Sequence, residues 1–196
     1  MELIFRSYIA LFLVLVSSSV YSSTNNQALS SDSIKTKKVL MIGNSFTFYW
    51  NLPQVIECMF QERNENITVD QRTIGGSNLA KHWMLNKKED YSIEKYEYLV
   101  LNDHSTNPLT NVDACGKYIR KFVELAKENN SIPLIYGTWE YPYLKDISKN
   151  KKSNTMEILD SISKVNQAIY VPVGNAFKYL EESYPEINLY LSLIHI

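Results

Sequence analysis

Short apolar runs alternate with amphipathic segments along the chain from residue 38 onward. Most of the runs are continuously apolar, as strands buried in a parallel sheet are, and one alternates apolar with polar residues. The predicted strands cover residues 38–42, 67–74, 98–101, 132–136 and 170–173. The amphipathic segments place apolar residues three or four positions apart, which predicts helices. These helices begin near residues 53, 77, 113, 154 and 175.

The order of strands and helices predicts an α/β fold with a parallel sheet covered on both faces. Two helices carry more specific expectations. Ser77 is expected to cap the helix that follows it, because a serine hydroxyl accepts a hydrogen bond from a free N–H of the first turn. The helix over 154–168 is expected to turn four apolar residues inward: Ile158, Leu159, Ile162 and Val165.

Residues 1–22 have the pattern of a signal peptide. A weakly positive start precedes an apolar stretch from Tyr8 to Val16, and small residues follow up to Ser22. The apolar stretch is shorter than the ~20 residues of a membrane-spanning helix, so we expect export without a stable membrane anchor, to a secreted or periplasmic location. Residues 23–37 are rich in Ser, Asn and Thr and are expected to form a linker.

The composition limits which kinds of molecule or ion the protein is expected to bind. Twenty Lys and Arg stand against 21 Asp and Glu, and this balance argues against a nucleic-acid-binding protein. The two cysteines, Cys58 and Cys115, form no Cys-x-x-Cys pair and have no histidine beside them at metal-ligand spacing, so no structural zinc site is expected. They are expected to form either one disulfide or two buried free thiols.

Segments with glycines and polar residues follow three of the predicted strands, as residues 43–47, 75–78 and 102–108. The carboxyl ends of parallel strands meet at one edge of the sheet, where α/β proteins bind ligands. Ser45, at the start of a helix, is placed to be a nucleophile, and nearby backbone N–H groups can hold an oxyanion. Each segment alone is also an ordinary polar turn. Their common position at one edge favours a site.

These segments resemble the conserved blocks of the SGNH/GDSL hydrolase superfamily. Residues 39–47, Val-Leu-Met-Ile-Gly-Asn-Ser-Phe-Thr, are similar to the first block, in the branch with Gly-Asn-Ser where many relatives have Gly-Asp-Ser. Residues 74–79 resemble the second block and residues 96–108 the third. The resemblance spans a domain over 38–190 and implies a three-layer α/β/α sandwich with a parallel, flavodoxin-like sheet.

The resemblance also implies roles for individual residues. Ser45 would be the nucleophile and, through its N–H, an oxyanion donor, and Gly76 would supply a second N–H. The third block usually reads Gly-x-Asn-Asp, and this chain departs from it. The third oxyanion donor is therefore Asn102, Ser105 or Asn107, and we prefer Asn102.

The Asp-x-x-His block that supplies the rest of the triad in this superfamily is not found. The histidines of the chain are His82, His104 and His195. His82 is expected to be a surface or packing residue. Asp103 and His104 are neighbours in sequence and cannot easily form the contact between a carboxylate and an imidazole ring that a triad needs.

Residues 191–196, Leu-Ser-Leu-Ile-His-Ile, equal the translation of a common sequencing-library adapter. We therefore expect the natural sequence to be represented only as far as Tyr190, with the catalytic Asp and His encoded beyond it and the fragment itself inactive. The alternative is a genuine apolar C-terminal strand.

The predicted function is an exported serine esterase that hydrolyses O-acyl esters, such as O-acetyl groups on carbohydrates, without a metal or organic cofactor. Aromatic residues near the strand ends could stack on sugar rings. They are Phe46, Phe48, Tyr49, Trp50, Trp139, Tyr141 and Tyr143. A non-catalytic glycan- or anion-binding module on the same fold and an acyltransferase remain as alternatives.

Overall fold

The computed structural model describes residues 36–139 and 153–187. Within these ranges five strands form one sheet in the order β2-β1-β3-β4-β5, and each neighbouring pair is parallel. The strands are β1 (Lys37–Gly43), β2 (Ile67–Thr73), β3 (Tyr98–Leu101), β4 (Ile132–Tyr136) and β5 (Ile169–Val171). The predicted parallel sheet is confirmed. β1 includes Lys37, which the sequence had placed in the linker.

The helices follow the strands in the predicted order. The longer ones are α3 (Leu52–Gln61), α4 (Leu79–Glu89), α6 (Val112–Glu128), α8 (Thr155–Asn166) and α9 (Val173–Ser183). The shorter ones are α2 (Ser45–Phe48), η2 (Tyr49–Asn51), η3 (Ile93–Lys95) and α5 (Asn107–Thr110). Elements of three or four residues, such as η2, η3 and α5, are too short to show a periodic pattern in the sequence.

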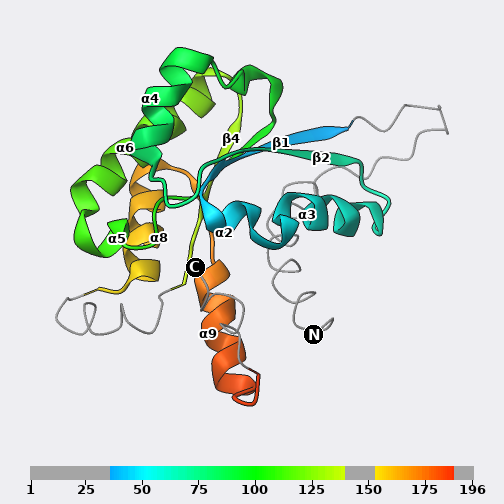
Figure 1. The fold of residues 1–196 in the computed structure, drawn as a ribbon, viewed down its shortest axis with the longest axis vertical. Coiled ribbons are helices and arrows are strands. Elements are labelled where there is room, and N and C mark those ends of the chain that lie inside the picture. The colour runs from blue at the N-terminus through cyan, green and yellow to red at the C-terminus, as the bar shows by residue number, and fades with distance from the viewer. Residues whose placement is uncertain (1–35, 140–152, 188–196) are drawn as a thin grey trace, which may run out of the picture.

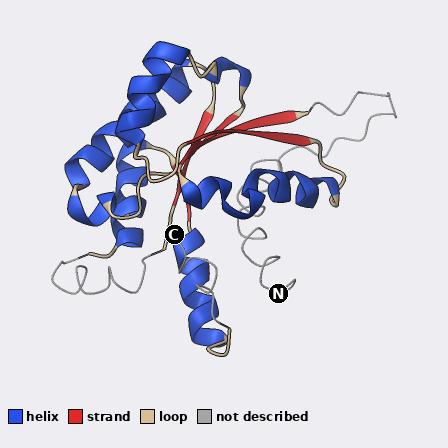
Figure 2. Cartoon of the chain, in the orientation of Figure 1, coloured by secondary structure: helices blue, strands red, loops and turns tan. Residues whose placement is uncertain are grey.

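The sheet separates two apolar cores. In β1, Val39 and Met41 face the core beneath α3 and α9, whereas Leu40 and Ile42 face the core beneath α4, α6 and α8. Alternate side chains of a strand point to opposite faces, so a run of four apolar residues fits a strand that is buried on both sides. Figures 1 and 2 show the resulting layers, with α3 on one side of the strands and α4 and α6 on the other. The expected three-layer α/β/α sandwich is confirmed.

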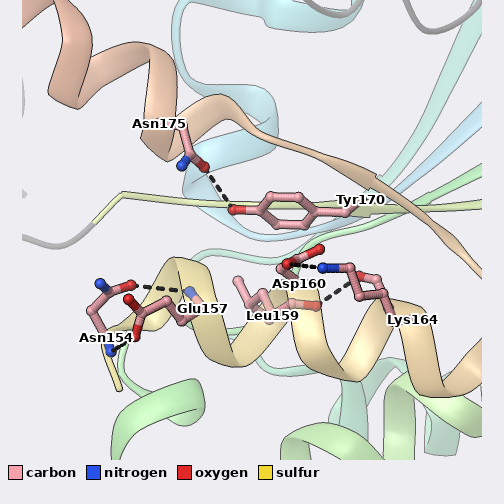
Figure 3. Close-up of polar contacts among 8 residues, drawn as sticks. Asn154, Glu157, Leu159, Asp160, Lys164, Tyr170 and Asn175 are labelled. Atoms are coloured by element: carbon pink, nitrogen blue, oxygen red, sulfur yellow. Dashed lines mark hydrogen bonds and ion pairs between the residues drawn. The ribbon is translucent and has the colours of Figure 1, made fainter. Parts of the chain in front are cut away.

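In helix α8 the apolar pattern predicts an inward position for a residue that the structure exposes. Asn154 caps this helix: its side chain accepts the Glu157 N–H at 3.0 Å, and the Glu157 carboxylate accepts the Asn154 N–H at 3.2 Å (Figure 3). Leu159 is buried as expected, but Val165 is 80 % exposed, so its predicted inward position is wrong. Six positions separate the two, which at 3.6 residues per turn carries Val165 well away from the core-facing side.

The two cysteines are free. Cys58 lies exposed on α3, and Cys115 is fully buried on α6. These helices cover opposite faces of the sheet, so the thiols cannot approach closely enough for a disulfide. The structure therefore excludes the disulfide, and of the two predicted buried thiols only Cys115 is buried.

Several sequence-based expectations concern residues outside the described ranges. They are the signal peptide, most of the linker, Tyr141, Tyr143 and the segment from residue 188 to 196 with His195. Among the described residues, no helix combines the length and apolar character that crossing a membrane requires.

Candidate active site at the carboxyl edge of the sheet

Ser45 stands directly beyond the carboxyl end of β1, as the first residue of α2. Asn44 caps this short helix, since its side-chain oxygen accepts the Phe46 N–H at 3.1 Å. Ser45 is half-buried, and among the described residues no group is hydrogen-bonded to its hydroxyl or its N–H. Both groups are therefore free to act on a bound molecule.

The Asn44 side chain joins three loops at this edge. Its amide nitrogen donates to the backbone carbonyl of Ser77 at 3.2 Å and to that of Asp103 at 3.1 Å. Asn44 is 2 % exposed, so these bonds form away from water, where an unpaired amide would be costly. The serine loop, the glycine turn after β2 and the loop after β3 are thus held together at the carboxyl edge of the sheet.

Gly76 forms the tip of the turn after β2. The Ser77 N–H donates to the Ile74 carbonyl at 3.1 Å, and Gly76 has a φ of +64°, which is the left-handed region that favours glycine. Gly76 is exposed, and its N–H makes no hydrogen bond with any described residue. The turn therefore presents a free backbone donor close to the serine loop, to which Asn44 connects it through the Ser77 carbonyl.

Asn102 begins the loop after β3 and is packed against the serine loop. Its backbone N–H donates to the Ile42 carbonyl at 2.9 Å, and its side-chain oxygen accepts from the Thr47 hydroxyl at 3.5 Å. A Cβ placed on Gly43 would lie 2.9 Å from the Asn102 Cβ, so only glycine allows this approach. Asn102 is 1 % exposed, yet its amide nitrogen has no hydrogen-bond partner among the residues that the structure describes.

The other two candidates for the third oxyanion donor differ from Asn102. The Asn107 amide nitrogen donates to the Asp103 carboxylate, at 3.2 and 3.3 Å to its two oxygens. Ser105 is buried. Its hydroxyl makes no hydrogen bond to a described residue, but Asn102 is the candidate whose donor atom is itself fully buried without a partner among the described residues.

Asp103 and His104 do not form an acid–base pair. The Asp103 carboxylate accepts the backbone N–H of His104 at 2.8 Å and that of Leu79 at 2.9 Å. The His104 ring instead places Nδ1 2.9 Å from the Thr106 hydroxyl. Asp103 therefore stabilises the loop after β3 by accepting these backbone hydrogen bonds.

Burial raises the pKa of the Cys115 thiol, and the neighbouring Asp103 carboxylate acts in the same direction.

Ser77 does not cap α4, contrary to the expectation. Asn78 does, because its side-chain oxygen accepts the Lys81 N–H at 3.0 Å. The Ser77 hydroxyl lies 2.8 Å from Nε2 of His82, which is 1 % exposed. His82 is thus a packing residue and not a surface one. Its position three residues after the buried Leu79 is the signal that places it on the inner face of α4.

Burial lowers the pKa of His82 below 6.5, and Lys81 acts in the same direction. The Gly43 carbonyl and the Asp103 carboxylate oppose this shift. The ring is therefore held neutral inside the structure.

The aromatic residues after the strands divide into core and surface. Phe46 packs on Trp139 with ring centroids 4.5 Å apart, and Trp139 stacks on Phe177 at 4.0 Å. Trp50, just beyond α2, is 63 % exposed and has a φ of +55°. Trp50 is accessible to a bound molecule, whereas Phe46 and Trp139 belong to the core. No group of three or more His, Cys, Asp or Glu side chains suited to a metal ion occurs within 36–139 and 153–187.

No protein-family model matches the chain, and no curated protein sequence is significantly similar to it. Solved structures do match. A candidate SGNH hydrolase from Slackia heliotrinireducens has 23 % identity and a TM-score of 0.59, covering 74 % of this chain and 83 % of its own. The acetyl xylan esterase AlAXEase has 14 % identity and a TM-score of 0.60, covering 76 % and 84 %.

The SGNH-hydrolase family esterase AlinE4 also matches, with 14 % identity, a TM-score of 0.58 and coverage of 83 % of this chain and 86 % of its own. These three proteins share the layered arrangement that carries Ser45, Gly76 and Asn102 here at one sheet edge. The described part of this chain therefore has the fold of the SGNH/GDSL hydrolase superfamily.

Proposed function

We propose that this protein is an exported serine ester hydrolase. The Ser45 hydroxyl attacks the carbonyl carbon of an ester, and a general base takes its proton. The negative charge moves to the carbonyl oxygen, where the N–H groups of Ser45 and Gly76 and the Asn102 amide donate to it. The tetrahedral intermediate expels the alcohol, which receives the proton, and water then releases the acid from the acyl-enzyme.

The observation that carries this proposal is the unpaired amide of Asn102. A buried donor without a partner costs about 1–3 kcal/mol. The amide is buried, unpaired and packed beside the loop that holds Ser45. An oxyanion bound at this edge would supply the missing acceptor, and the interaction would form only as the negative charge develops.

The general base is proposed to come from outside the described residues. The His82 ring is buried in contacts with Ser77 and Gly43, and the His104 ring is bonded to Thr106. The sequence-based expectation places the catalytic Asp and His beyond Tyr190, and we keep this as part of the proposal. No metal or organic cofactor enters the reaction.

The proposed substrate class is an O-acylated carbohydrate, such as an acetylated sugar. One structural neighbour is named as an acetyl xylan esterase, which supports this choice. The exposed indole of Trp50 lies close to Ser45 in sequence, at the same edge of the sheet, and offers a flat apolar face to a sugar ring. An acyltransferase would use the same groups, with a second alcohol in place of water.

Hydrolysis of p-nitrophenyl acetate tests the proposal in two forms of the protein. One is the 196-residue chain, and the other continues past Tyr190 with the downstream sequence of the gene, here called the extended protein. We expect turnover by the extended protein and background rates from the 196-residue chain. Ser45→Ala should abolish turnover with little change in melting temperature, because the Ser45 hydroxyl makes no hydrogen bond to any described residue.

Full activity of Ser45→Ala would remove Ser45 as the nucleophile. An extended protein that binds acetylated sugars but never hydrolyses them would favour the binding module. Export is tested separately, by mass spectrometry of protein secreted from an expressing cell. An N-terminus near residue 23 is expected, and retention of the N-terminal segment would contradict export.

A further inference from the structure

His82 connects two loops that are far apart in the sequence. From the inner face of α4, its Nε2 lies 2.8 Å from the Gly43 carbonyl oxygen and 2.8 Å from the Ser77 hydroxyl. Its Nδ1 lies 3.2 Å from the Tyr91 hydroxyl. The ring is 1 % exposed, so both nitrogens are partnered inside the protein.

These contacts define the tautomer and the protonation state of the His82 ring. A carbonyl oxygen can only accept, so Nε2 carries the hydrogen and donates to Gly43. A neutral ring then leaves Nδ1 as an acceptor for the Tyr91 hydroxyl. The lowered pKa of His82, which follows from its burial, agrees with this neutral form.

The two residues that Nε2 contacts lie close in the chain to the proposed oxyanion donors. Gly43 lies two residues before Ser45, and Ser77 directly follows Gly76. The Ser77 hydroxyl is also 3.5 Å from the Gly43 carbonyl, so the end of β1, the glycine turn and the His82 ring form one cluster. Movement of the ring would therefore change the separation of the Ser45 and Gly76 N–H groups.

The bond to Gly43 is not needed merely to satisfy a buried carbonyl. The same oxygen already accepts the Ile74 N–H at 3.1 Å, as the continuation of the pairing between β1 and β2. An apolar side chain at position 82 would leave that bond in place. The imidazole thus adds a second connection, from α4 to the strand end, at the point where the strand end meets the glycine turn.

We propose that His82 is a positioning residue that fixes the glycine turn against the end of β1 and so sets the spacing of the Ser45 and Gly76 N–H groups. The role in catalysis rests on the proposed function. The positioning of the turn does not, because it follows from the contacts alone.

The kinetic test uses the extended protein with His82→Leu and His82→Gln. Leucine fills the site without a donor, whereas the glutamine amide nitrogen can take the place of Nε2 and donate to Gly43. Loss of one whole oxyanion donor lowers kcat by about 10²–10³. We expect misplacement in His82→Leu to lower kcat by about tenfold to hundredfold, with KM within about twofold. His82→Gln should recover kcat to within about threefold of the parent.

Met84→Leu is the matched control, because Met84 lies on the same helix and is 58 % exposed. It should leave kcat and KM unchanged. A normal kcat in His82→Leu, or no recovery in His82→Gln, would overturn the catalytic role. If His82→Leu fails to fold, Ser77→Ala removes only the hydroxyl contacts to His82 and to the Gly43 carbonyl and should lower kcat without unfolding the protein.

A second measurement needs no turnover. In ¹H–¹⁵N spectra of the 196-residue chain, the amide resonances of Gly76 and Ser45 should shift in His82→Leu and return toward their parent positions in His82→Gln. The Leu159 amide, on α8, should stay in place, because Leu159 belongs to neither the glycine turn nor the serine loop. Unmoved Gly76 and Ser45 resonances in folded His82→Leu would overturn the positioning itself. Full activity of Ser45→Ala would instead remove the proposed function and leave this result standing.

Discussion

The Asn44 side-chain amide donates to the Asp103 carbonyl at 3.1 Å, although 59 positions separate the two residues in the chain. The same nitrogen reaches the Ser77 carbonyl, and the side-chain oxygen caps α2. An asparagine provides a donor and an acceptor in one group, whereas an ionised aspartate provides only acceptors. This explains why Asn fits the serine loop of this protein, where many members of the superfamily that it resembles have Asp.

Asn44→Asp should therefore destabilise the protein. The new carboxylate would face two carbonyl oxygens in a buried position, so we expect a loss of at least about 2 kcal/mol in the free energy of unfolding. Urea denaturation at neutral pH measures it. Asn78→Asp is the matched control, because Asn78 caps α4 only by accepting the Lys81 N–H, which Asp does equally well. Equal stability of the two variants would contradict the donor role of Asn44.

Asn102→Ala should lower the rate of ester hydrolysis by the extended protein by about 10²–10³ in kcat, as loss of one oxyanion donor does. The cost in stability should be smaller than for Asn107→Ala. Asn102→Ala loses the 3.5 Å bond from the Thr47 hydroxyl but also removes an unpaired buried amide nitrogen, whereas Asn107→Ala loses the bonds to the Asp103 carboxylate. Kinetics and urea denaturation of both variants check the prediction. A larger rate loss in Asn107→Ala would reverse the assignment.

At the two glycines beside the site, the order of stability of the Ala and Asn variants should be opposite. At Gly76 the left-handed φ costs Ala roughly 1–2 kcal/mol, but a Cβ there meets nothing within 4 Å and Asn tolerates this backbone region. Gly76→Asn should thus be more stable than Gly76→Ala. At Gly43 a Cβ would run into the Thr47 hydroxyl and Asn102, so Gly43→Asn should be less stable than Gly43→Ala. Urea midpoints of the four variants test the inversion.

The stability of the folded chain should depend on the charge of His82. Burial lowers its pKa in the folded state below 6.5, the ordinary value for the unfolded chain. As the pH falls through 6.5, the unfolded chain binds a proton that the folded chain excludes, and the free energy of unfolding decreases. His82→Gln should remove this part of the decrease between pH 7.5 and pH 5, measured by urea denaturation. His104→Gln serves as the control, since its ring lies in a more accessible loop.

Thiol titration should count one reactive cysteine in the native protein and two after unfolding without a reductant. Cys58 is exposed, whereas Cys115 is fully buried on the other face of the sheet. Burial also raises the pKa of the Cys115 thiol, which keeps it protonated and slow to react. Cys58→Ser should abolish the native signal. Absence of free thiols in the unfolded chain would instead show the disulfide that this structure excludes.

The apolar pattern alone determined the layers of this protein, because a strand buried on both faces needs a continuous apolar run and a covering helix needs an apolar stripe. It also determined that Ser45 and Gly76 meet at one edge, since parallel strands bring their carboxyl ends together. The local pattern does not show which side chains from distant segments come into contact, and those contacts decide the roles of the individual polar residues.

Only the tertiary structure distinguished Asn102, with its unpaired buried amide, from Asn107, whose amide is bound to Asp103. Only the tertiary structure shows that Ser77 contacts His82 instead of capping α4, and that Val165 lies outside the core. The hydrogen bonds of Asn44 and Asn102 that hold the three loops of this site together join residues 33, 55 and 59 positions apart, and contacts at such separations cannot be read from a local stretch of sequence.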